Sequence, residues 1–295
     1  MIFVRPLGAA LAALSLAALP LVVGAASPQP CAAPSERAST WRDDPAWYDG
    51  KAEKCVYRAV RTIYGLPREH EARAYTNKQH MDPRTTTKSV DSSGVAVFKH
   101  HWSRRVPTEN YDYDFSTASF LEVDGLAPFK LAIGTQEDCG ASYKQVTRRG
   151  GKLAVLEATY FPGGGLRELE LPAGTEFRDS LSLRLRDYPF DAPRDLQLSL
   201  VQRQEDPRSR PWEPRRLLVR SAGVEDLVVP AGSFRAHRLE LVDPQGSAVL
   251  ERFWFAADGS APLLHVLLRW EGEDGASAEL VSQERTAYWE RPTAR

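Results

Sequence analysis

Residues 55–64 read CVYRAVRTIY, a run in which β-branched and aromatic residues crowd together at alternating positions. This period of two is typical of a β-strand, because successive side chains of a strand point to opposite faces. Gly65-Leu66-Pro67 interrupts the run before a more polar one, Glu69–Asn77. Two such runs separated by turn residues predict a β-hairpin.

The same alternation continues along the chain, and turns rich in Gly, Pro and Asp separate the runs. Further strands are predicted at 95–102, 129–133, 144–148, 152–161, 196–202, 216–221, 225–229, 234–242, 248–255, 263–270 and 277–288. Phe177–Tyr188 is the one segment that favours a short helix, ending before Pro189. The pattern predicts an all-β fold with few short helices, as a large curved antiparallel sheet or a partly open β-barrel. We expect a single antiparallel β domain over residues 46–290, with two fused β halves meeting near 165–190 as the alternative.

The first 26 residues predict a secretory signal peptide. A short positive start, Met1–Arg5, precedes the apolar run Leu7–Val23, and small residues follow at 24–26. An uncleaved anchor is the alternative for this segment. Residues 27–45 are rich in Ser, Pro and Ala and predict a flexible leader. We therefore expect export to the periplasm or cell envelope, and no integral membrane domain in the mature chain, since no later run approaches about 18 apolar residues.

Three cysteines follow the predicted cleavage site, Cys31, Cys55 and Cys139. Disulfides persist in exported proteins, and an odd count leaves one thiol over. We favour a bridge between Cys55 and Cys139, because both lie in patterned sequence whereas Cys31 lies in the leader. Closing that loop would stabilise the fold by about 4 to 5 kcal/mol in the chain-entropy model.

The charge balance excludes several classes of partner. With 38 basic and 39 acidic residues, the chain has no global field that favours nucleic acid. The densest basic stretch, Arg203–Arg220, is broken by acidic residues and prolines and is predicted to be a solvated loop leading into a strand. Gly163-Gly164-Gly165 lacks the Lys-Ser/Thr of a phosphate loop, so no cofactor is predicted.

Neither histidines nor acidic residues give a strong site. Adjacent His100 and His101 point to opposite faces of a strand and cannot ligate one ion, so no metal site is predicted. Asp112 and Asp114 would share a face of an extended segment, where an acidic pair can do acid–base work. The alternative, which we favour, is a solvated strand face with Tyr111 and Tyr113 turned inward.

Residues 135–144, TQEDCGASYK, resemble the start of a papain-like cysteine protease, which carries C-G-[SA]-C-[WY] around its nucleophile. Ser142 stands where the nucleophilic Cys belongs. The sequence that follows reads as strand and turn in place of the helix such an enzyme needs, and both Asn residues of the chain, Asn77 and Asn110, lie upstream. A structural Cys-Gly turn between two strands is the better interpretation.

The C-terminal third resembles a family of bacterial periplasmic proteins of unknown function whose patterns are P-A-G-[ST]-F and W-F-x-x-D. Here they appear as VVPAGSFRA at 228–236 and RFWFAAD at 252–258. Earlier blocks resemble a set of equally uncharacterised secreted bacterial proteins: WYDGKAE at 47–53, RTIYG at 61–65, VFKHHW at 97–102, NYDYDF at 110–115 and TQEDCGASY at 135–143. The resemblance implies a fold similar to the half-open barrels that carry lipoproteins across the periplasm.

These observations predict a secreted, non-enzymatic protein of the cell envelope, with a concave β face that binds a lipid, a lipoprotein or another apolar ligand. Its candidate ligand-binding residues are Trp102, Tyr111, Tyr113 and Trp254. For Trp254 we favour a place in the core, because aromatics in such a motif usually build the sheet. The alternatives are an envelope hydrolase that uses Asp112 and Asp114, and a structural interaction module.

Overall fold

The computed structural model describes residues 41–245 and 248–290. Their strands form one 15-stranded sheet with the order β8-β7-β6-β5-β4-β3-β2-β1-β15-β14-β13-β12-β11-β10-β9. In chain order the strands are β1 (Ala52–Ile63), β2 (Leu66–Met81), β3 (Val95–Val106), β4 (Tyr113–Glu122), β5 (Pro128–Glu137), β6 (Gly140–Arg149), β7 (Lys152–Thr159), β8 (Gly165–Pro172), β9 (Thr175–Phe177), β10 (Leu196–Val201), β11 (Arg215–Val229), β12 (Gly232–Val242), β13 (Val249–Ala256), β14 (Leu267–Glu271) and β15 (Ser277–Thr286). Neighbouring strands are antiparallel except β9 and β10. The predicted all-β fold is confirmed.

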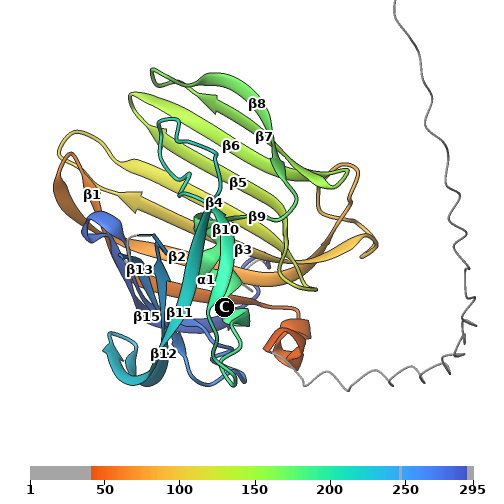
Figure 1. Cartoon of the computed structure of the whole chain (residues 1–295), viewed down its shortest axis with the longest axis vertical. Coiled ribbons are helices and arrows are strands. Elements are labelled where there is room, and N and C mark those ends of the chain that lie inside the picture. Colours follow the sequence, from red (N-terminus) through yellow and green to blue (C-terminus); the bar gives the residue numbers. More distant parts are fainter. Residues whose placement is uncertain (1–40, 246–247, 291–295) are drawn as a thin grey trace, which may run out of the picture. The chain divides into compact units, whose positions relative to one another are not determined.

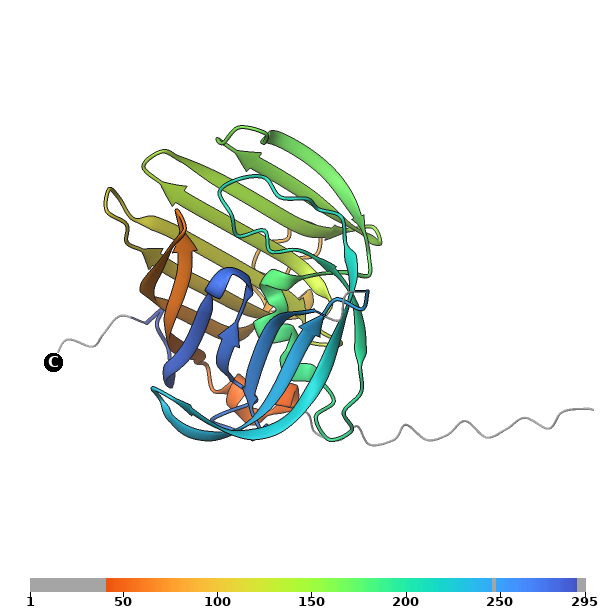
Figure 2. The ribbon, with the colours of Figure 1, turned by 60° about the vertical axis from the view of Figure 1, so that its left-hand side comes forward.

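The sheet curls into a nearly closed barrel (Figures 1 and 2). Along β4 each buried residue is followed by a half-buried one from Tyr113 to Glu122, as a strand with one face toward a core requires. The two edges of the sheet, β8 and β9, are consecutive in the chain. The seam of the barrel therefore lies where the chain passes from one edge strand to the other.

Strands β11 and β12 form a long, strongly curved hairpin within the sheet (Figure 2). The ladder shifts register between Ser221 and Gly223, and Gly223 has φ +99°, which glycine adopts without the strain of a Cβ. Beyond this bulge the hairpin turns toward β15, where the Ala231 amide donates to the Leu280 carbonyl at 3.0 Å.

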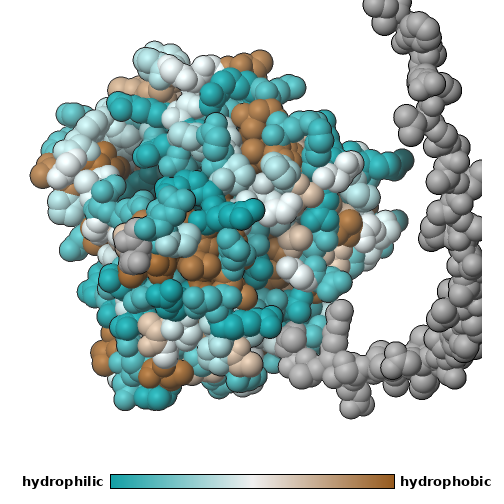
Figure 3. Space-filling view, viewed as in Figure 1, coloured by the Kyte–Doolittle hydropathy of each residue, from teal (hydrophilic) through white to brown (hydrophobic). Residues whose placement is uncertain are grey.

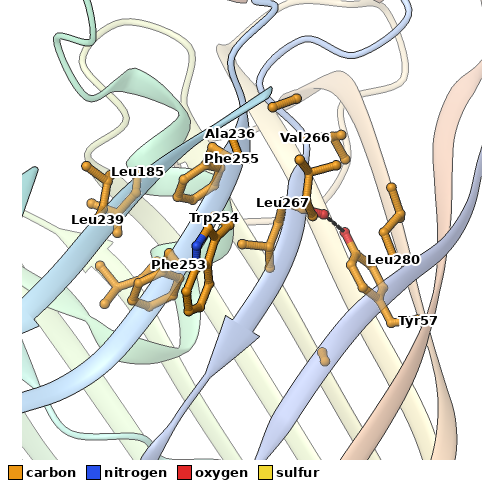
Figure 4. Close-up of a cluster of buried hydrophobic side chains, with 14 of the residues drawn as sticks. Tyr57, Leu185, Ala236, Leu239, Phe253, Trp254, Phe255, Val266, Leu267 and Leu280 are labelled. Atoms are coloured by element: carbon orange, nitrogen blue, oxygen red, sulfur yellow. Dashed lines mark hydrogen bonds between the residues drawn. The ribbon is translucent and has the colours of Figure 1, made fainter. Parts of the chain in front are cut away.

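A helical segment lies inside the curve of the sheet. It consists of η3 (Arg178–Ser180), α1 (Leu181–Arg184) and η4 (Leu185–Asp187), so the helix predicted over 177–188 is present as one α turn between two 3-10 turns. Leu181 and Leu185 are fully buried and belong to the largest hydrophobic cluster, with Phe253 and Phe255 of β13 (Figure 4). The segment fills the space that the curled sheet encloses.

The predicted leader overlaps the described residues at its end. Short 3-10 helices occupy η1 (Trp41–Asp43) and η2 (Pro45–Tyr48). Trp41 is buried and stacks on Phe98 with ring centroids 5.0 Å apart, so the chain is packed against the fold at Trp41. The predicted signal peptide, residues 1–26, and Cys31 lie outside the described residues. Among the described residues, no helix has the length and apolarity needed to span a bilayer.

The predicted disulfide between Cys55 and Cys139 is not formed, because both side chains are free thiols. Cys55 is buried on β1, whereas Cys139 is exposed in the turn after β5, four strands away in the sheet order. That separation is about 19 Å along the sheet at about 4.8 Å per strand, and bridged cysteines need Cα atoms within about 7 Å. Patterned sequence around each cysteine showed that both lie in the fold, but not that they meet.

Labelling with iodoacetamide followed by peptide mapping should distinguish the two thiols. Burial, and then the nearby Glu53, raise the pKa of the Cys55 thiol well above its usual value, so its reactive thiolate is scarce. In the native protein we expect label on Cys139 and none on Cys55, and label on both after denaturation. A peptide that links the two cysteines under non-reducing conditions would contradict the structure.

Trp254 is 5% exposed and belongs to the largest hydrophobic cluster. Its Nε1 donates to Glu225 at 2.7 Å, and the Arg269 guanidinium lies 5.7 Å from its ring. Arg269 in turn donates to the Val228 carbonyl at 3.0 Å. The indole is therefore held in the core beside the end of the β11–β12 hairpin.

We expect Trp254→Ala to destabilise the fold by about 3 to 5 kcal/mol, since it removes a large buried side chain and leaves a cavity. Urea unfolding of the variant and the parent measures the difference. Trp289→Ala is the matched control, because Trp289 is 51% exposed and should change stability by less than about 0.5 kcal/mol. Equal losses in the two variants would show that the hairpin does not bury Trp254.

Candidate functional site

The helical segment is tied to the surrounding strands by charged and polar groups. Arg186 of η4 donates two hydrogen bonds to Glu53 of β1, at 2.7 and 3.1 Å, and both side chains are 1% exposed. Buried pairs of this kind need such a bidentate geometry to offset the cost of desolvation. Arg178 of η3 pairs with Glu251 of β13, which lies three strands from β1 in the sheet order. The segment is therefore tied to two separate strands of the sheet.

His100 connects the same segment to a third strand, β3. Its Nε2 accepts from Trp102 Nε1 at 2.6 Å and contacts the Ser182 hydroxyl of α1 at 3.0 Å. Because Nε2 accepts, the ring proton is on Nδ1 and is donated to Thr76, 2.8 Å away. Burial, and then the charge of Arg186, lower the pKa of His100 well below its usual value, so the ring is neutral.

The contact of Ser182 with His100 has the spacing of a nucleophile and its general base. Two observations oppose a catalytic role. The lone pair of Nε2 already accepts from Trp102, and the adjoining cavity measures only about 40 Å³, close to the volume of a single water. The group is a satisfied buried network that places Trp102, one of the predicted ligand-binding residues, at 8% exposure.

Glu251 lies at the centre of a cluster with two guanidiniums and an indole. Arg178 donates to it at 2.5 Å, Arg203 donates to its other oxygen, and Trp270 Nε1 donates at 2.6 Å. Burial alone would raise the pKa of Glu251, but Arg203 and Arg178 outweigh burial and hold that pKa below its usual value. Glu251 is therefore ionised at neutral pH.

Glu205 forms a second cluster next to the first. It accepts from Arg104 of β3, and an Arg61 nitrogen lies 3.6 Å from the same carboxylate oxygen. Burial lowers the pKa of Arg61 to about 10, against the opposing effect of Glu205, and the guanidinium lies 3.9 Å from the centre of the Phe115 ring. The other oxygen of Glu205, Oε1, is buried and has no hydrogen-bond partner among the described residues.

The loop that carries Glu205, residues 202–214, is fixed inside the barrel. Lys144 of β6 is 1% exposed and donates to the carbonyls of Gln204, Asp206 and Arg208 at 2.9, 3.1 and 2.9 Å. The Asp179 carboxylate accepts from the Gln204 amide at 2.9 Å. A solvated loop was predicted here. This prediction is wrong for the first part of the loop, where Gln204 and Glu205 are buried and Lys144 binds the carbonyl groups.

Two residues of the stretch TQEDCGASYK take part in the same contacts. Asp138 and Cys139 form the turn between β5 and β6, and Gly140 begins β6, in agreement with the structural interpretation. The Ser142 hydroxyl donates to the Pro207 carbonyl, and Lys144 holds the three carbonyls named above. Ser142 and Lys144 thus fasten the loop of residues 202–214.

These two clusters line a cleft of about 350 Å³. Arg61, Arg104, Arg178 and Arg203 all contribute to its wall, and the Trp270 indole lies 4.5 Å from the Arg203 guanidinium. The cleft adjoins the small cavity beside Trp102 through shared lining residues. This arginine cleft is the candidate functional site.

Asp112 and Asp114 lie apart from this cleft. Arg105 binds Asp114 through two nitrogens at 2.8 Å and lies 3.9 Å from Asp112, and all three side chains are exposed. The hydrogen bond from Arg105 holds the pKa of Asp114 below its usual value. A general acid needs a raised pKa, so the lowered pKa of Asp114 argues against its use as a general acid.

Tyr111 and Tyr113, two further predicted ligand-binding residues, meet at the end of the barrel where three turns converge. Tyr113 is 6% exposed and its ring stacks on Phe115 at 6.1 Å. Their hydroxyls approach that of Tyr64 from the β1–β2 turn. Among the described residues, no group of three or more His, Cys, Asp or Glu side chains has a metal-binding arrangement.

The structure places the four predicted residues in three regions. Trp102 adjoins the cleft, Trp254 lies beneath the hairpin, and Tyr111 and Tyr113 lie at the barrel end. The arginines and Trp270 of the cleft were missed. Of these residues only Arg203 had a signal, because it lies in the arginine-rich stretch after β10 that was interpreted as solvated.

Glu251→Gln should destabilise the protein by about 3 to 5 kcal/mol at neutral pH, because it leaves two buried guanidiniums without their anion. The lowered pKa also gives a pH dependence. The folded state binds this proton less readily than the unfolded state, so the stabilisation is present above the ordinary glutamate pKa and is lost as pH falls through the folded value. Urea midpoints at neutral and acidic pH should show a smaller acid loss in the variant.

Glu284→Gln is the control, since Glu284 is 57% exposed in its pair with Lys54 and should cost at most about 1 kcal/mol. A Glu251→Gln protein as stable as this control would contradict the buried cluster.

Comparison with known proteins gives a structural likeness. No family model matches the chain, and no curated protein matches it either. The chain is similar to a crystal structure described as a beta-barrel-like protein of domain of unknown function DUF1849 from Brucella abortus. The two share 12% sequence identity with a TM-score of 0.49, over 80% of this chain and 98% of that chain.

Proposed function

We propose that this chain is a non-enzymatic protein of the cell envelope that binds an anionic ligand bearing an apolar group, and that the arginine cleft is its binding site. The observation that carries the proposal is the convergence of four guanidiniums on one cleft beside an exposed edge of Trp270. Export rests on the sequence of residues 1–26, outside the described residues.

Guanidinium groups are the feature of the cleft that would bind an anion. Arg61 and Arg104 share Glu205, and Arg178 and Arg203 share Glu251. The lining also includes Arg210 and the carboxylates of Asp206, Glu273 and Asp274, so opposite charges are close to balance and an anion would bind by accepting hydrogen bonds from the guanidiniums. Burial raises the pKa of Asp179, with Arg203 opposing. At the rim, Glu273 is 53% exposed, so solvent screens its charge.

The apolar part of the ligand would pack against Trp270. Its indole stacks with Arg203 and is half-buried at the cleft wall, an arrangement that suits a flat or hydrocarbon group beside an anion. The helical segment occupies the interior beside Trp102, where the cavity measures about 40 Å³, too small for an acyl chain. The proposal therefore moves the predicted apolar ligand from the concave face of the sheet to the cleft.

On the face shown in Figure 3, apolar side chains appear in patches among hydrophilic ones, so this face gives little support to a broad lipid-docking surface. A ligand of limited size that enters a cleft fits this surface better than a membrane that covers it.

Two fluorescent probes test the proposal, since both become bright when bound. 8-Anilinonaphthalene-1-sulfonate carries an anion on an aromatic body, and N-phenyl-1-naphthylamine is the same body without the anion. We expect saturable binding of the sulfonate and at least tenfold weaker binding of the amine. Equal binding of both would overturn the role of the guanidiniums.

Arg203→Gln should weaken sulfonate binding at least tenfold, while Arg178 and Trp270 still hold Glu251. Arg235→Gln is the matched control, because Arg235 is 60% exposed in a pair with Asp226 on the distant hairpin. Melting curves establish that both variants are folded. Unchanged sulfonate binding in a folded Arg203→Gln protein would exclude the cleft as the site.

A further inference from the structure

Three tyrosine hydroxyls, a carboxylate and a thiol meet at the end of the barrel. Tyr64 comes from the turn between β1 and β2, Tyr111 from the loop before β4 and Tyr113 from its first position. Glu137 ends β5, and Cys139 lies in the turn that follows. The hydroxyl of Tyr111 lies 3.3 Å from that of Tyr64 and 3.3 Å from that of Tyr113. Tyr64 and Tyr113 are also in hydroxyl contact with each other. The three oxygens thus form a closed triangle.

Two further donor atoms approach the same triangle. The Glu137 Oε2 atom lies 3.2 Å from the Tyr111 hydroxyl, and the Cys139 Sγ atom lies 3.0 Å from it. The Tyr111 oxygen therefore has four polar neighbours. A hydroxyl offers one hydrogen and two lone pairs, which is enough for three hydrogen bonds.

The cluster as a whole has more contacts than hydrogens. Its five contacts draw on three hydroxyl hydrogens and one thiol hydrogen, because the carboxylate of Glu137 only accepts. At least one close approach of two electronegative atoms is thus not a hydrogen bond. A cation held between the oxygens would convert that repulsion into attraction.

The spacing also suits a small ion. Ligands at about 2.0 Å around an octahedral ion stand about 2.8 Å from their neighbours. The Tyr111 hydroxyl lies 3.3 Å from that of Tyr64, 3.3 Å from that of Tyr113 and 3.2 Å from Glu137, so a small adjustment reaches that value. Tyr64 can supply the adjustment, since it is 69% exposed in a two-residue turn. Tyr113 is buried and supplies the fixed side. Ions can enter from the side of Tyr64 and Cys139, which are both exposed.

We infer that Tyr64, Tyr111, Tyr113 and Glu137 form a binding site for a hard trivalent cation, with ferric iron as the ion it fits best. Phenolate and carboxylate oxygens are hard ligands, and iron accepts a tyrosine phenolate in other proteins. Each phenol that ligates releases its proton to solvent. The site is independent of the arginine cleft, because none of its residues lines that cleft.

Addition of ferric nitrilotriacetate to the purified full chain tests the inference directly. Phenolate bound to ferric iron produces a visible charge-transfer absorption and characteristic tyrosinate bands in resonance Raman spectra, which iron on carboxylates alone does not. We expect one saturable equivalent per chain with both signatures. A chain that stays colourless at excess iron would overturn the inference.

Substitutions then assign the signal. Tyr64→Phe removes an exposed hydroxyl and should leave the melting curve unchanged, while it weakens iron binding at least tenfold; Tyr111→Phe should abolish the absorption. Tyr143→Phe is the matched control, because Tyr143 is 42% exposed and lies on β6, outside the cluster, and it should retain the signal. Full absorption in both Tyr64→Phe and Tyr111→Phe would place the iron elsewhere and overturn the site.

Cys139→Ser decides the chemical class of the ion. Retention of the absorption supports a hard cation on oxygen ligands. Its loss, together with binding of Cu²⁺ by the parent, would show that the thiolate is a required ligand and would overturn the assignment to a hard ion.

Discussion

The ion pairs around the helical segment are the constraint on which the rest of the structure depends. A sheet that curls this far encloses space, and the segment from Arg178 to Asp187 fills it. Arg186 binds Glu53 on one wall, and Arg178 binds Glu251 on the other. Buried charges must be paired to be tolerated, so the strands that supply the glutamates have to stand where the arginines reach them.

The arginine cleft is a by-product of the same requirement. Each of the two central glutamates has two guanidinium neighbours, and all four arginines also line the cleft. The arginines that pair with the buried glutamates thus also place guanidinium donors along the cavity wall. Trp270 contributes to both, since its indole donates to Glu251 and also borders the opening.

The alternation of residues in runs such as CVYRAVRTIY was enough to predict the all-β class and most strands, because a half-buried strand leaves its period in the sequence. The helix over 177–188 was also predictable from its position before Pro189. The strand order was not predictable, and the prediction of a disulfide was wrong for that reason. The positions of Cys55 and Cys139 in the chain do not tell how many strands separate them in the sheet.

The candidate site was harder to predict than the fold. Arg203, Glu205 and Lys144 look like solvent-exposed residues by composition, and only their partners elsewhere in the chain make burial tolerable. The tyrosine cluster was missed as a metal site because sequence motifs for metals rely on His and Cys spacing. Its phenols come from turns that are distant in sequence, so no local pattern brings them together.

The strand order has a consequence for how the chain folds. If the sheet is followed from its β9 edge, the strands run in sequence from β9 to β15 and then from β1 to β8. Every neighbour is thus also the next strand along the chain, except at the pairing of β1 with β15, where Lys54 and Glu284 meet across 230 positions. Each run of hairpins can form from local contacts, and the slow entropic step is the single closure between the first and last strands. The first and last strands thus meet within the sheet, and its free edges lie midway along the chain.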